Sequence, residues 1–131
     1  MTIIADASAL IAIITGESDA DMLANTLEAD DARRCSAVSV REAMAGLRRS
    51  HSFTVAEARS QIDLFLNAGG FRFVNIGERE WKTAAEPFAA YGKERHPAAH
   101  NMGDCFAHAC ARSNQAKPLY KGDDFEQTDL G

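Results

Sequence analysis

The 131 residues contain no apolar run that approaches the length needed to cross a bilayer, which is about 20 residues. The first residues also lack a positively charged segment followed by a long apolar core, the pattern of a secretory signal. We therefore expect a protein of the cytoplasm that does not enter a membrane.

Cysteine is scarce as well. Cys35, Cys105 and Cys110 are an odd number of thiols, and each lies among apolar residues. A disulfide framework uses paired cysteines in an oxidising compartment. The sequence therefore predicts reduced thiols.

Positive charge is not in surplus, because 14 Lys and Arg residues face 19 Asp and Glu residues, a net charge of −5. This balance argues against a general nucleic-acid binder. Acidic side chains gathered in one pocket would produce the same balance, and a bound divalent cation would offset part of it. The length and the hydrophobic share of 46% are typical of one globular domain over residues 1–131.

Short apolar runs alternate along the chain with segments of helical periodicity. Strands are predicted at residues 2–5, 35–37, 71–76 and 117–120, with helices over 7–14, 17–28, about 40–51, 55–68, 78–91 and from about 102 onward. Residues 30–34 are predicted to form a charged, solvated turn. This alternation indicates right-handed crossovers, and hence an α/β fold with a short, mainly parallel central sheet surrounded by helices.

Isolated acidic residues stand at similar places in this pattern. Asp6 directly follows the first strand, Glu42 lies among apolar residues, Asp104 lies in the first turn of the last helix, and Asp123 and Asp124 follow the last strand. The carboxyl ends of parallel strands meet at one edge of a sheet, where α/β folds place their ligands. We therefore expect these carboxylates to converge.

Structural roles compete with this interpretation. Asp6 and Asp104 also suit the N-terminal ends of helices, where a carboxylate is favoured. Glu42 follows Ser39 by three residues, the spacing of a capping box. Its apolar neighbours favour an inward carboxylate instead. Ser8 is expected to bond either Asp6 or the helix backbone.

Four carboxylates in one pocket would not all remain ionised without a cation. Oxygen ligands favour a hard ion, Mg²⁺ or Mn²⁺, and such an ion is typical of phosphoryl chemistry. A zinc site is disfavoured, because the chain has no CxxC pair and no HxxxH pair.

Four segments carry a resemblance to a known family. They are residues 6–10 (Asp-Ala-Ser-Ala-Leu), 36–42, 96–106 and 121–129. Together, in this order and spacing, they resemble PIN-domain ribonucleases, and more narrowly the VapC toxins of bacterial toxin–antitoxin pairs. The resemblance implies a PIN-like fold and a metal-dependent endoribonuclease that cuts structured RNA, often transfer RNA. It also implies a VapB-like antitoxin as partner.

Matched residue by residue, the resemblance makes Asp6, Glu42, Asp104 and Asp123 the acidic metal-binding and catalytic set. Asp124 is adjacent to Asp123 and is the alternative fourth ligand. Ser8 and Asn101 match supporting positions. Many relatives carry Thr at the position of Ala7, so Ser8 is expected to supply the hydroxyl of the first motif. Asn101 precedes Asp104 by three residues. We expect hydrolysis of an RNA phosphodiester bond by a water that the metal activates.

Basic residues must bring RNA to an acidic site, because phosphate contacts dominate affinity. For each of them alone, a solvated surface charge is the simpler interpretation. The candidates are Arg33, Arg34, Arg48, Arg49, Lys93, Arg95, His96 and Lys121.

A homodimer is also expected. The first two helices offer Leu10, Ile11, Ile13, Ile14, Met22, Leu23 and Leu27, more apolar surface than so small a sheet would cover.

Two other functions remain open. A phosphate-accepting receiver domain has this length and an acidic strand edge, but it needs an acidic pair after the first strand and an acceptor Asp after a middle strand. Asp6 stands alone, and no predicted middle strand ends in Asp. A catalytically silent PIN-like RNA-binding module is the second alternative, and the presence of all four acids weighs against it.

Overall fold

The computed structural model describes residues 2–91 and 102–121, without the side chains of residues 86–91, 102 and 104. Its elements alternate between strands and helices, as the sequence predicted. In chain order they are β1 (Thr2–Ala5), α1 (Ala7–Thr15), α2 (Ala20–Glu28), β2 (Ala32–Cys35), α3 (Ala37–His51), α4 (Val55–Ala68), β3 (Arg72–Phe73), α5 (Glu78–Tyr91), α6 (Met102–Ser113) and β4 (Lys117–Leu119).

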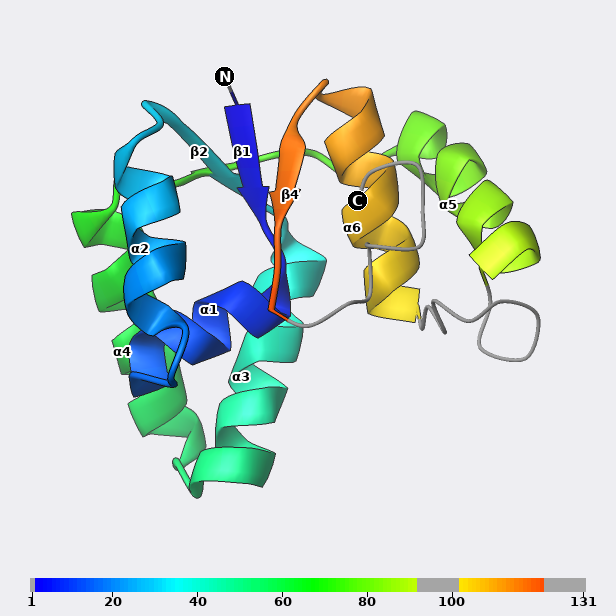
Figure 1. The fold of residues 1–131 in the computed structure, drawn as a ribbon. Coiled ribbons are helices and arrows are strands. Elements are labelled where there is room, and N and C mark those ends of the chain that lie inside the picture. Colours follow the sequence, from blue (N-terminus) through cyan, green and yellow to red (C-terminus); the bar gives the residue numbers. More distant parts are fainter. Residues whose placement is uncertain (1, 92–101, 122–131) are drawn as a thin grey trace.

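The four strands form one sheet in the order β3-β2-β1-β4, and every neighbouring pair is parallel. This confirms the predicted α/β class. Helices α1 to α4 lie to one side of β1 and β4, and α5 and α6 lie to the other (Figure 1).

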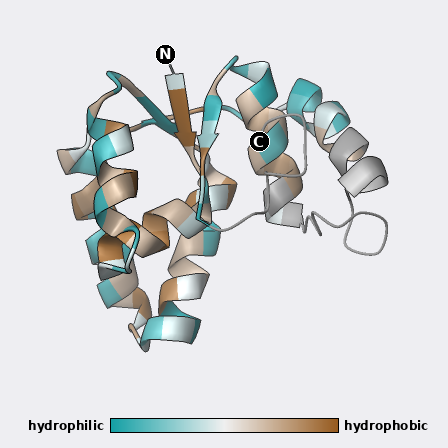
Figure 2. Cartoon of the chain, in the orientation of Figure 1, coloured by the Kyte–Doolittle hydropathy of each residue, from teal (hydrophilic) through white to brown (hydrophobic). Residues whose placement is uncertain are grey.

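Strand β1 is buried on both faces. Ile3 packs with Leu23 and Leu27 of α2, whereas the next residue, Ile4, packs with Cys110 and the neighbouring Ala111 of α6. Successive side chains of a strand point to opposite faces, so a run of apolar residues suits a central strand covered on both sides. Figure 2 shows β1 in the brown of hydrophobic residues. The residue that follows β1 is thus fixed near the centre of the sheet edge.

Helix α3 begins earlier than the sequence indicated. The Ser36 side chain accepts a hydrogen bond from the Ser39 amide and is the N-cap, so the predicted cap at Ser39 is wrong. The Ser39 hydroxyl instead lies 3.3 Å from that of Ser36. Because the helix starts at Ala37, Glu42 lies in its second turn and is not the partner of a capping box.

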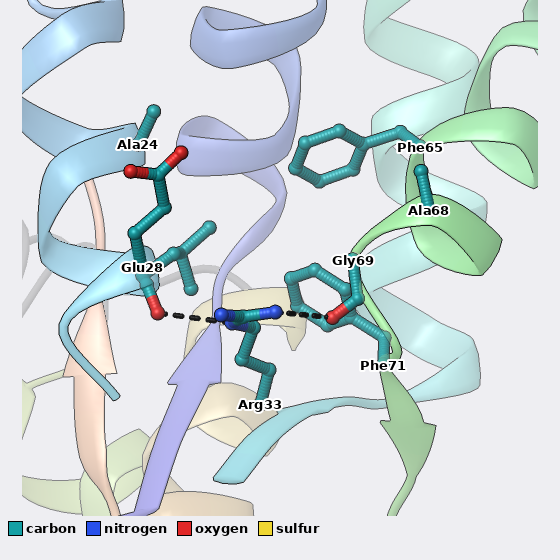
Figure 3. A pocket seen from close by; sticks show the side chains of 8 residues that line it. Ala24, Glu28, Arg33, Phe65, Ala68, Gly69 and Phe71 are labelled. Atoms are coloured by element: carbon teal, nitrogen blue, oxygen red, sulfur yellow. Dashed lines mark hydrogen bonds between the residues drawn. The ribbon is translucent and has the colours of Figure 1, made fainter. Parts of the chain in front are cut away.

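The charged turn predicted over residues 30–34 is largely strand. Arg33 lies in β2, and its guanidinium donates to the carbonyl oxygens of Leu27 (2.9 Å) and Gly69 (2.6 Å). Figure 3 shows this side chain between the end of α2 and the end of α4, beside Phe65 and Phe71. The side chain therefore satisfies carbonyls at two helix ends, where cations are favoured.

Three large apolar residues of the helices are exposed: Met22 (63%), Leu64 (63%) and Trp81 (64%). In α4 the buried positions are Ala58, Ile62 and Leu66, four residues apart, and Leu64 falls two residues off this row, on the far side of the helix. The predicted strand over residues 71–76 is also shorter, since only Arg72 and Phe73 pair with β2.

The start of α5 holds the C-terminal end of α6. Glu80 of α5 is buried and accepts a hydrogen bond from the Gly77 amide (2.8 Å), which is the main cause that lowers its pKa to about 2. Arg79 donates both to the Glu80 carboxylate (3.2 Å) and to the carbonyl of Ser113 in α6 (3.1 Å), so it bridges the two helices. No helix in the described part of the chain is long and apolar enough to span a membrane.

Candidate active site

Asp6 occupies the point where the central strand passes into a helix. Its backbone amide continues the pairing with β4 by donating to the Leu119 carbonyl (2.9 Å). Its side chain is the N-cap of α1, and Oδ2 accepts from both the amide (3.1 Å) and the hydroxyl (2.7 Å) of Ser8. The predicted Ser8 contact and the predicted cap are both confirmed.

Glu42 reaches the same place from α3. A Cβ atom built on Gly103 would lie only 1.7 Å from Oε1 of Glu42, so the carboxylate fills the space beside a residue that has no side chain. This contact brings α3 against the first turn of α6. Gly103 is therefore a site residue whose role the sequence pattern did not reveal, because its neighbour Glu42 lies 61 positions away in the chain.

Electrostatics link the two carboxylates. Burial raises the pKa of Glu42 above its ordinary value, and the negative charge of Asp6 raises it further. Arg49, about two helical turns further along α3, acts in the opposite direction but more weakly. Glu42, whose ionisation is disfavoured by burial and by the neighbouring charge, is together with Asp6 a fitting pair of ligands for a divalent cation.

Asp104 follows Gly103 in the first turn of α6, as predicted. The structure thus brings the Asp6 side chain, the Glu42 side chain and the backbone at 103–104 together. The side chain of Asp104 lies outside the described residues, as do Asn101, Asp123, Asp124, Lys93, Arg95 and His96. In the described ranges, no three His, Cys, Asp or Glu side chains form a group that would hold a metal.

Two of the basic candidates lie at the end of α3. Arg48 and Arg49 are exposed in its last turn, and Arg49 is close enough to Glu42 to influence its pKa. Arg33 is instead engaged by carbonyl groups, as described above. Lys121, directly after Tyr120, pairs its ammonium group with Glu17, a residue that no sequence pattern singled out.

Two of the three cysteines do not contribute a reactive thiolate. Cys35, Cys105 and Cys110 are buried, and none of them forms a disulfide in the described part of the chain, in agreement with the predicted reduced thiols. Burial raises the pKa of Cys35 to about 12 and that of Cys110 to about 11. Both thiols are therefore protonated at neutral pH, and a thiolate nucleophile is excluded for these two residues.

Comparison with known proteins agrees with this geometry. The model of the PIN domain family matches residues 3–130. A protein named VapC ribonuclease from Rhizobium meliloti is 38% identical, covering 96% of this chain and 97% of that protein. A VapC ribonuclease of Mycobacterium bovis (95% and 93% covered) and ribonuclease VapC of Mycolicibacterium smegmatis (95% and 95%) are each 33% identical. The chain therefore belongs to the PIN-domain family, and proteins named VapC ribonucleases are among its relatives.

Proposed function

We propose that this chain is an endoribonuclease, the toxin of a type II toxin–antitoxin pair, and that it cuts structured RNA such as transfer RNA. The convergence of Asp6, Glu42 and the start of α6 at the carboxyl edge of the sheet carries the proposal. The chain matches these relatives over nearly their whole length, and their names as ribonucleases support RNA cleavage as the reaction.

The metal of this site is Mg²⁺ or Mn²⁺ in our proposal. Asp6, Glu42 and Asp104 would hold it, together with Asp123 or Asp124. The donor set fits, since it consists of carboxylate oxygens. Burial and, second, the charge of Asp6 raise the pKa of Glu42, and a bound cation would offset both effects. When bound, such an ion supplies an acidified water and polarises the phosphate.

Other residues of the chain orient the two carboxylates. Ser8 donates two hydrogen bonds to one oxygen of Asp6 and so fixes the orientation of the carboxylate. Gly103 leaves the space that the Glu42 carboxylate occupies. Both acids must be ionised to act as ligands, so activity should rise from acid toward neutral pH.

RNA reaches an acidic site through basic residues, because phosphate contacts supply most of the affinity. Arg48 and Arg49 lie exposed at the end of the helix that carries Glu42. With them we propose Lys93, Arg95 and His96, whereas the ammonium group of the predicted candidate Lys121 is engaged by Glu17. Unpaired, splayed bases suit a recessed site better than an A-form duplex, so cuts should fall at few positions in loops.

The partner we propose is a VapB-like antitoxin, and the place of action is the cytoplasm.

We also propose a homodimer, although the surplus of exposed apolar surface predicted for α1 and α2 is smaller than expected. Leu10, Leu23 and Leu27 are buried within the protomer. Met22 is the large apolar residue of these two helices that is exposed. Light scattering of the isolated chain tests the dimer, and a monomer at high micromolar concentration would refute it.

RNA cleavage by the purified protein tests the main proposal. Cleavage should require Mg²⁺ or Mn²⁺, stop on addition of a chelator, and weaken in high salt. Asp104→Asn and Asp6→Asn should each abolish it. Cleavage that ignores chelator and persists in Asp104→Asn would indicate a contaminating nuclease. RNA binding without cleavage would favour a silent binding module, and phosphate uptake from a small donor would favour a receiver domain.

A further inference from the structure

An ion pair outside the predicted acidic set lies at the end of β4. The Lys121 ammonium group contacts the Glu17 carboxylate and lies 3.9 Å from Oδ1 of Asp19. Glu17 and Asp19 belong to the turn between α1 and α2, 104 and 102 positions before Lys121 in the chain. Figure 1 shows the end of β4 beside the start of α1.

These groups are partly shielded from solvent. Lys121 is 39% exposed, whereas Glu17 and Asp19 are 24% and 25% exposed. Oδ1 of Asp19 is buried, and no hydrogen-bond donor in the described part of the chain reaches it, so the Lys121 charge is what offsets it. Lys121 also lowers the pKa of Glu17. Lys121 is therefore held in a partly buried ion pair and is not a freely solvated surface charge.

The backbone of Lys121 connects this pair to the acidic site. Its amide donates to Oγ of Ser8 (2.9 Å), and the same Oγ donates to Oδ2 of Asp6 (2.7 Å). A hydroxyl has one proton, and a lone pair that accepts from Lys121 helps to direct this proton toward Asp6. The start of α1 and the end of β4, distant in the sequence, thus meet at one hydroxyl group.

We propose that Lys121 is a positioning residue, whose ion pair with Glu17 holds the end of β4 so that its amide orients Ser8 on Asp6. The proposal rests on the proposed function in that Asp6 is taken as a metal ligand. It assigns Lys121 to this role in place of a direct contact with RNA. In the sequence, Asp123, another predicted ligand, follows Lys121 by two residues.

Hydrogen exchange tests the anchor without any metal. In Glu17→Gln the sequence around Lys121 is unchanged, yet the Lys121 amide should exchange faster because its hydrogen bond to Ser8 is less well held. An unchanged exchange rate would refute the proposal, whether or not the protein proves to be a nuclease. Lys82→Met is the matched control, since it removes an exposed ion pair with Glu78 on α5.

Mn²⁺ titration of the RNA-free protein tests whether the ion pair supports metal binding at the acidic site. Glu17→Gln and Lys121→Met should each weaken Mn²⁺ binding about tenfold, the lower end of what loss of a supporting contact costs a metal site. Their double variant should be little worse than either single change, and the exchange Glu17→Lys with Lys121→Glu should restore part of the affinity. Lys82→Met should bind Mn²⁺ as the wild type does.

RNA affinity in the presence of chelator separates the two roles of Lys121. A positioning residue leaves this affinity nearly unchanged in Lys121→Met, whereas a phosphate contact would lower it and leave Mn²⁺ binding intact. The second result would overturn the positioning role. If the wild type binds no Mn²⁺ and cuts no RNA, the proposed function fails, and the exchange experiment alone then decides on the anchor.

Discussion

Glu42 is the residue at which burial and charge act against ionisation. Its pKa is higher in the folded chain than in the unfolded chain, because of burial first and Asp6 second. Between these two pKa values the folded state holds more protons, so its free energy of unfolding falls as pH rises. Above the pKa of Glu42 in the folded state, its ionisation lowers the free energy of unfolding by the full amount. Below its pKa in the unfolded state, Glu42 no longer lowers this free energy.

Glu42→Gln should therefore stabilise the metal-free protein at neutral pH and have little effect at about pH 4. Urea unfolding in the presence of chelator measures both values. Glu57→Gln is the opposite control, because hydrogen bonds with Thr54 lower the pKa of Glu57. That substitution should destabilise the protein at neutral pH. If Glu42→Gln is instead destabilising at neutral pH, the conflict between Glu42 and Asp6 is not present.

Gly103 has a role that depends on its missing side chain. Gly103→Ala would place a Cβ atom 1.7 Å from Oε1 of Glu42, so the carboxylate must turn away. Since Glu42 is flexible, the fold should survive, but Mn²⁺ affinity should fall by about tenfold or more. Calorimetric titration measures the loss. At Gly77 a Cβ atom would lie 3.7 Å from Glu80, an ordinary contact, so Gly77→Ala should bind Mn²⁺ normally.

At the scale of elements, Arg33 joins the ends of two helices that differ widely in sequence position. Arg33→Met would leave the carbonyl groups of Leu27 and Gly69 without their charged donor. Hydrogen bonds to charged groups contribute about 1.5–3 kcal/mol each, and partial replacement by water reduces this, so we expect a loss of about 1–3 kcal/mol in the free energy of unfolding.

Urea denaturation of Arg33→Met and Arg34→Met provides the comparison. Arg34 neighbours Arg33 in β2, but among the described residues its Nη1 reaches only the adjacent Arg33 carbonyl, at 3.3 Å. Arg34→Met should therefore lower the free energy of unfolding clearly less than Arg33→Met does. Equal losses in the two variants would mean that the bridge between α2 and α4 contributes nothing specific.

At the scale of the whole molecule, metal binding should stabilise the fold. The site is assembled from β1, α3 and α6, so a cation bound there favours the folded state over the unfolded chain. Mn²⁺ or Mg²⁺ at 100 times its Kd should raise the free energy of unfolding by about 2.7 kcal/mol. Thermal unfolding measures the shift, which should disappear in Asp6→Asn. Stabilisation by zinc alone would contradict a hard-metal site.

The sequence by itself determined the alternation of elements and the position of each acid relative to them. The β-branched run before Asp6 and the acid directly after it were sufficient to place Asp6 at a strand end. Local signals of this kind act over a few residues: the N-cap Thr54 marks the start of α4, and the left-handed Gly16 (φ 69°) marks the end of α1. The resemblance of four motifs then identified the family.

Only the tertiary structure decided which faces of the helices are covered and which distant residues meet. Leu64 and Trp81 are exposed because neighbouring positions of their helices already fill the contact with the core. The Gly103 contact with Glu42 and the Lys121 pair with Glu17 each join residues more than 60 positions apart. No local periodicity encodes such contacts, because they arise from the order β3-β2-β1-β4, which brings separate segments to one sheet edge.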